Sequence, residues 1–193
     1  MEADEFVTQL RRRHETSTQA SSATLVATID AINETLQSNN MNKSFVAYLG
    51  ACMSALTRVS SSEESATLTA LCALLAAVIP HVPKHYIQSK FKMMVSMLCT
   101  AIGSLEEAES WAGVKWAVQS LSHVLAAPDL DGTWASAKAG FIFLVKMAMD
   151  SHPKARRAAQ EGLALVIETY QGTAAHQPAS QELADGTCPS NAL

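Results

Sequence analysis

The sequence predicts an all-α fold in which antiparallel helical hairpins stack on one another, on three observations. Apolar residues recur three and four positions apart through most of the chain, and no segment alternates as a half-buried strand does. Of the 193 residues, 48% are apolar and only 6% are aromatic, which is enough apolar material for one sizeable core. Hairpins begin near residues 43, 84 and 133, a repeat of about 40 to 50 residues that is typical of helical-repeat arrays.

Seven apolar stripes predict about seven helices. In chain order they cover residues 25–36, 45–59, 68–78, 87–98, 111–125, 134–148 and 159–170. An Asn-rich break separates the first two stripes, and Ser61 followed three residues later by Glu64 predicts a capping box before the third. Pro80 and Pro83 end the third stripe, and a polar segment over 103–109 precedes the fifth.

The segment over residues 150–160 joins the last two stripes by a turn and then starts a helix with a basic first turn. Asp150 can accept backbone hydrogen bonds in the turn, Pro153 suits the first turn of a helix, and Ala155 lets the helix pack closely. This is the shape of a HEAT-type repeat, so we expect a HEAT- or armadillo-like α-solenoid that serves as a binding scaffold. A closed helical bundle would show the same stripes and is the alternative.

Charge and cysteine content narrow the class of protein. A formal net charge of -4 argues against a surface built wholly for nucleic acid, so any such contact must be local. Cys52, Cys72, Cys99 and Cys188 form no CxxC pair, which favours reduced residues in an intracellular compartment. The acidic start of the chain lacks the apolar core of a signal peptide, and the most apolar run, residues 66–79, is too short to cross a bilayer.

The stripes divide the chain into three parts. We expect a polar N-terminal segment over 1–20 that could hold a partial helix, a HEAT-like repeat domain over 21–172, and a disordered tail over 173–193 where no apolar stripe continues. If the chain is a piece of a longer array, its last stripe lacks a neighbour. Leu163, Val166 and Ile167 should then be partly exposed.

No residue pattern predicts catalysis, and we expect no catalytic residue, cofactor or metal. His81 and His85 are four residues apart, but Pro80 and Pro83 interrupt the helix there and no HExxH order follows. His123 lies in an apolar stripe and is expected to be a packed, hydrogen-bonded histidine rather than a general base.

The candidate partner contacts are Lys154, Arg156 and Arg157. Three cations in the first turn of a helix interact unfavourably with the helix dipole, so they are not explained by helix stability. Contact with a binding partner could explain them. The alternative is that they pair with acids of an adjacent helix or lie in water. Trp116 lies away from the main stripe of its helix and could face a neighbouring repeat or a ligand groove; we expect packing between repeats.

Several segments resemble the N-terminal helical region of the ribosomal RNA-processing protein 12 family. They are residues 44–49, the Glu63-Glu64-Ser65 cap, the Val82-Pro83 corner with residues 87–91 behind it, Val114-Lys115-Trp116, the Asp129-Leu130 turn leading to Trp134, and the run over 152–160. The resemblance covers roughly residues 23–178. Its most specific part is the last run, in which Pro, Lys, Arg, Ala-Ala and Gln stand together at fixed offsets.

The resemblance implies a HEAT-repeat nucleolar factor that accompanies pre-ribosomal particles through maturation and nuclear export. Its partners would be pre-ribosomal RNA, assembly proteins and transport proteins in the nucleus and nucleolus, with neither a membrane nor a small-molecule substrate. This chain is far shorter than the family's chains, so we expect a fragment or a truncated product. Two other functions stay open: a general protein-binding or nuclear-transport adaptor solenoid, and an enzyme not recognised from its sequence.

Overall fold

The computed structural model describes residues 2–17, 19–59, 64–127 and 134–187, and within these ranges the chain is helical and contains no strand. Nine α-helices and one short 3-10 helix are present in the described ranges. Their bounds are α1 (Ala3–Glu15), α2 (Ala20–Ser38), α3 (Phe45–Leu56), α4 (Ser65–Val78), η2 (Ile79–His81), α5 (Lys84–Glu107), α6 (Trp111–Leu125), α7 (Trp134–Met147), α8 (Pro153–Tyr170) and α9 (His176–Thr187).

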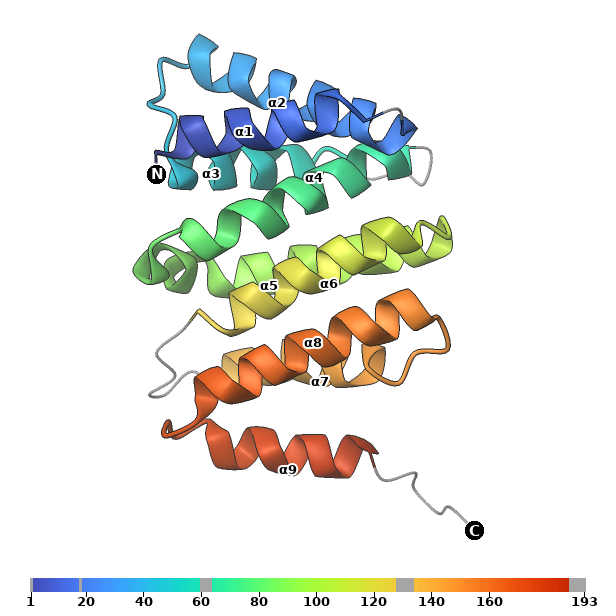
Figure 1. The fold of residues 1–193 in the computed structure, drawn as a ribbon. Coiled ribbons are helices and arrows are strands. Elements are labelled where there is room, and N and C mark those ends of the chain that lie inside the picture. The colour runs from blue at the N-terminus through green and yellow to red at the C-terminus, as the bar shows by residue number, and fades with distance from the viewer. Residues whose placement is uncertain (1, 18, 60–63, 128–133, 188–193) are drawn as a thin grey trace.

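The helices stack as an elongated array of antiparallel hairpins (Figure 1). Each even-numbered helix packs on the next, so that α2, α4, α6 and α8 form one layer. Helices α3, α5 and α7 lie behind α4, α6 and α8, and α9 packs on α7 and α8. The two termini lie at opposite ends and the array does not close on itself. The predicted α-solenoid is therefore confirmed, and the closed bundle is wrong.

The seven predicted stripes correspond to α2 through α8, and α6 shows why. Val114, Val118, Leu121 and Leu125 recur every three or four residues and are all 0% exposed, because α6 packs against α4, α5 and α8. Burying each such side chain contributes about 1.5–3 kcal/mol. An amphipathic stripe with this much burial stabilises a helix more than intrinsic propensity does.

Local signals set several helix ends. The Ser44 side chain accepts a hydrogen bond from the Ala47 N–H at 3.1 Å and caps α3. Pro80 falls within η2, and Pro83 stands immediately before α5. The proline pair thus ends α4 and turns the chain into the next hairpin, as the sequence predicts.

Two glycines allow α6 to approach its neighbours closely. A Cβ at Gly113 would lie 2.4 Å from Thr69 Oγ1 of α4, and a Cβ at Gly162 of α8 would lie 1.9 Å from Ser122 Oγ of α6. Ser122 is buried and its hydroxyl donates to the Val118 carbonyl at 2.8 Å. Side chains larger than hydrogen therefore do not fit at these contacts unless the helices move apart.

We predict that Gly162→Ala lowers the free energy of unfolding by about 1–3 kcal/mol, because the added methyl overpacks the α6–α8 contact. Gly103→Ala is the matched control, since Gly103 lies within α5 and a Cβ there meets nothing within 4 Å. It should stabilise the chain by about 0.4–1 kcal/mol. Urea unfolding followed by circular dichroism measures both. Equal stabilisation by the two variants would contradict the close approach of α6 and α8.

Both ends of the array extend beyond the predicted repeat domain. The disordered tail expected over 173–193 is wrong for residues 176–187, where α9 forms; Ala175 and Ala179 are 0% exposed and Leu183 packs on the core. Residues 188–193 lie outside the described ranges. At the other end α1 is a full helix rather than a partial one, and its Val7 is 1% exposed. Acidic residues in its first turn and basic residues in its last turn suit the helix dipole.

Helix α9 also corrects the expected exposure of the last stripe. Leu163 is 7% exposed and Val166 is 0% exposed, so the prediction is wrong for both, because α9 packs beside α7 and α8. Ile167 is half-buried and lines an apolar depression together with the exposed Met149. The predicted capping box at Ser61 and the turn at Asp129 and Leu130 lie outside the described residues.

Candidate functional site

Hydrogen bonds shape the turn that carries the predicted partner contacts. Asp150 Oδ1 accepts from the His152 N–H at 2.6 Å, and His152 Nδ1 accepts from the Lys154 N–H at 3.3 Å. Pro153 occupies the first turn of α8, where its missing N–H costs nothing. The acidic acceptor that the sequence predicts in this turn is therefore present.

Arg156 has a structural partner in the same turn. Its Nη1 donates to the Asp150 carbonyl at 2.9 Å and to the Ser151 carbonyl at 3.1 Å, and the side chain is half-buried. The guanidinium satisfies carbonyls that follow α7. This contact offsets the unfavourable position of a cation near the start of α8 without any binding partner.

The other two predicted contacts point to solvent and differ from each other. Arg157 Nε donates to Glu161 Oε1 at 3.0 Å within α8, and both side chains are largely exposed at 84% and 58%. The exposed Lys154 side chain makes no ion pair or hydrogen bond to a described residue. The structure therefore does not bring the three cations into one site, and only Lys154 and Arg157 are available to a partner.

An aromatic contact that the sequence analysis did not predict lies beside this turn. The rings of Trp111 and His152 stack with centroids 3.9 Å apart and an angle of 4° between their planes. Since Trp111 begins α6 and His152 precedes α8, the stack ties two neighbouring hairpins together.

The pKa of Glu106, at the end of α5, is raised mainly by burial and also by the charge of nearby Asp150.

We predict that Arg156→Ala lowers the free energy of unfolding by about 1 kcal/mol, because two carbonyl contacts of a charged donor are lost. Lys154→Ala is the control on the same helical turn and should change stability by less than about 0.5 kcal/mol. Thermal unfolding of both variants measures the difference. If Arg156→Ala unfolds like Lys154→Ala, the turn does not depend on the guanidinium.

The layer of even-numbered helices carries a second candidate site, which we term the α2–α6 groove. It has a volume of about 430 Å³ and is bounded by the end of α1, the start of α2, the outer side of α4 and one side of α6. Its floor consists of small side chains of α4. These are Ala70, Ala73, Ala76 and Ala77.

The wall formed by α6 is a single helical stripe. Ala112, Trp116, Gln119 and His123 are spaced by four, three and four residues, so they share one side of the helix. Trp116 was expected to pack between repeats; it is half-buried and one side of it lines the groove. His123 is half-buried and has no hydrogen-bond partner among the described residues, so the expected hydrogen bond is absent there. Burial lowers the pKa of His123, which favours the neutral imidazole.

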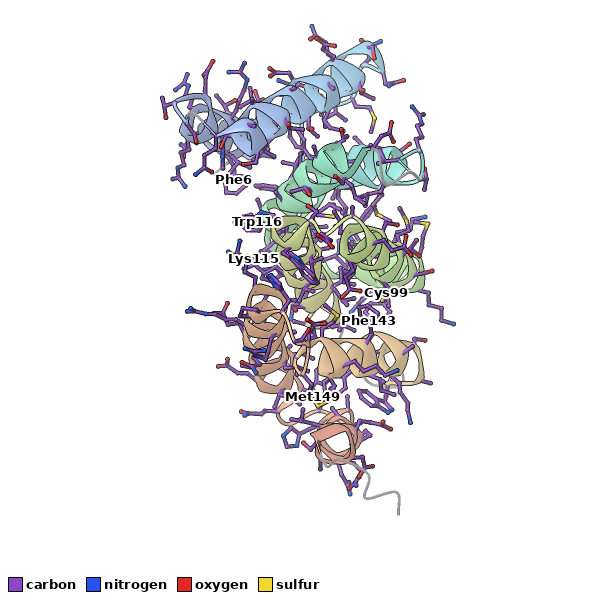
Figure 2. All side chains as sticks on the ribbon, turned by 90° about the vertical axis from the view of Figure 1, so that its right-hand side faces the viewer. Phe6, Cys99, Lys115, Trp116, Phe143 and Met149 are labelled. Carbon is purple, nitrogen blue, oxygen red and sulfur yellow. The ribbon has the colours of Figure 1, made fainter. Side chains whose placement is uncertain are left out.

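No carboxylate lines the α2–α6 groove, and cations flank it. Lys115 Nζ lies 4.7 Å from the centre of the Trp116 ring, and both residues lie on the side opposite Cys99 (Figure 2). Asp30 is paired: Arg11 donates to its two carboxylate oxygens at 2.7 and 3.0 Å. This pairing lowers the pKa of Asp30. His14 completes the opposite wall, with Nδ1 3.2 Å from Ser22 Oγ.

The groove is lined by apolar side chains together with hydroxyl, amide and imidazole groups. Among the described residues no group of three or more His, Cys, Asp or Glu side chains could hold a metal ion. In the same part of the chain, none of the helices has the length and apolar character needed to cross a membrane. Sequence reasoning singled out Trp116 and His123 separately; it missed that the alanines of α4 bring them into one groove with α1 and α2.

One protein family and two known proteins are similar to this chain in sequence. A family described as RRP12-like, N-terminal HEAT repeats, matches residues 1–188. An RRP12-like protein of Homo sapiens is 24% identical over 170 residues, and an RRP12-like protein of Gallus gallus is 26% identical over 153 residues. The matches cover 85% and 78% of this chain but only 13% and 12% of the relatives, so the chain spans about an eighth of their length. No solved structure matches.

Proposed function

Because the chain belongs to the family of RRP12-like N-terminal HEAT repeats, we propose that it is a scaffold in ribosome biogenesis. It binds pre-ribosomal RNA or assembly proteins during rRNA processing and subunit export, in the nucleus and nucleolus. The observation that carries this proposal is the family match over residues 1–188. The stacked helices support it, because such an array offers a long surface for partners.

The charge distribution favours assembly proteins over RNA as the direct partners of this region. The chain has a formal net charge of -4, and two arginines beside the candidate surfaces are already paired: Arg11 with Asp30 and Arg157 with Glu161. Tight RNA binding needs several free cations along a phosphate backbone. The same observation supports the second candidate function, a general protein-binding or nuclear-transport adaptor.

Affinity purification of the tagged chain from nuclear extract, with and without RNase, separates these functions. The scaffold function predicts recovery of ribosome-assembly proteins together with pre-ribosomal RNA, identified by mass spectrometry and sequencing. Recovery of unrelated transport proteins that resist RNase would favour the adaptor. Absence of any pre-ribosomal component would contradict the scaffold.

We also predict that the double variant Lys154→Glu, Arg157→Glu recovers less pre-ribosomal material, by about fivefold or more, because both exposed cations of α8 become acidic. The matched control is Lys90→Glu, Lys92→Glu, which makes the same charge change at exposed positions of α5. Quantitative mass spectrometry of the purified complexes measures the ratio. An equal loss in both variants would show that net charge, and not the α8 turn, matters.

A further inference from the structure

We propose that the α2–α6 groove docks an extended, acidic segment of a partner protein, anchored by one apolar side chain. The inference deepens the proposed function and rests on its protein-binding part. It specifies the surface on which the partner binds and the chemical character of the partner segment that this surface recognises. Three properties of the groove lead to it: its apolar floor, its unpartnered polar groups and the sign of the charges around it.

The floor and the Trp116 wall suit an apolar anchor. The four alanines of α4 leave the room that larger side chains would fill, and the volume of about 430 Å³ lies within the range typical of ligand pockets. Trp116 adds a large, half-exposed aromatic ring, a residue type that dominates binding energy at interfaces. A leucine or aromatic side chain of a partner would be buried between this ring and the alanines.

Polar groups beside the anchor site indicate an extended segment rather than a helix. Gln119 and His123 line the groove and make no hydrogen bond to any described residue. An amide side chain can donate to a peptide carbonyl and accept from a peptide N–H. An extended segment has such groups free, whereas a helix has already paired them internally. Gln119 is thus suited to hold a partner backbone one turn of α6 beyond Trp116.

Charge complementarity selects an acidic partner. Lys115 lies over Trp116 at one wall of the groove. Arg13, next to His14, is exposed and makes no ion pair within the described residues. Two acids near this end of the groove, Glu15 and Asp30, both pair with Arg11. A carboxylate next to the apolar anchor would therefore meet cations, whereas a basic segment would meet like charge.

RNA fits this groove less well, although it is also anionic and its bases could stack on Trp116. A phosphate backbone requires a row of cations, and the floor of the groove is a row of alanines. The occupant inferred is therefore a protein segment, and RNA binding is one of the outcomes that the experiment separates.

The test is selection of a phage-displayed library of random peptides on the wild-type chain, with counter-selection on Ala73→Glu. That variant places a carboxylate on the floor of the groove, at a half-buried position. Ala139→Glu, at an exposed position of α7, is the matched control. Thermal unfolding confirms that each variant folds. Enriched peptides should carry Asp and Glu around a leucine or an aromatic residue, and they should bind Ala139→Glu as they bind the wild type.

A labelled peptide from the selection is then titrated against single variants. Trp116→Ala should weaken binding about thirtyfold, or about 2 kcal/mol at 1.4 kcal/mol per tenfold. Lys115→Glu should weaken it about tenfold and reverse the loss of affinity with added salt. Both residues are half-buried at the surface, so the two variants need not disturb the core.

Three results would overturn the inference. They are enrichment of basic or uncharged peptides, equal enrichment on Ala73→Glu, and binding of single-stranded oligouridine that is lost in Trp116→Ala while no peptide is enriched. The last result would assign the groove to RNA. None of these experiments depends on pre-ribosomal particles. If the peptide selection fails, the proposed scaffold function is therefore unaffected. If the purification from extract fails, the inference about the groove is unaffected.

Discussion

Close contact of α6 with both α4 and α8 holds the middle of the helical array together. A Cβ at Gly113 on one side, or at Gly162 on the other, would fit only if neighbouring side chains or the helices shifted. Ser120 of α6 also donates to the Cys72 carbonyl of α4 at 3.2 Å, and Tyr170 of α8 donates to the Leu125 carbonyl of α6 at 3.0 Å. These contacts hold α4, α6 and α8 together as one layer, and α3, α5 and α7 lie behind these three helices.

The same layer explains how the α2–α6 groove forms. Small residues of α4 form the floor, and residues of α1, α2 and α6 surround them, so a depression forms on the surface of the array. Its polar groups are two amides, two imidazoles and three hydroxyls, and no carboxylate lines it. These groups can donate hydrogen bonds to a ligand and accept hydrogen bonds from it.

Periodicity in the sequence predicted the helices that bury large apolar side chains, because Leu, Val and Ile at helical spacing mark a core-facing stripe. It missed α9, because the buried positions there are alanines, Ala175 just before the helix and Ala179 within it, and alanine is too weakly apolar to show a stripe. It placed the basic turn of α8 correctly but could not show that Arg156 binds carbonyls of its own turn. The groove could not be predicted, because its walls come from four helices and only their packing brings Leu10 near Trp116.

We propose that this scaffold binds its partners on the layer of even-numbered helices. Photo-crosslinking tests it most directly: a benzoylphenylalanine at Gln119 in the groove is compared with one at Gln88, an exposed position of α5 on the other layer. In complexes from nuclear extract, the probe at position 119 should crosslink to an acidic segment of a protein, and the probe at position 88 should not. Crosslinks only from position 88, or only to RNA from position 119, would contradict the claim.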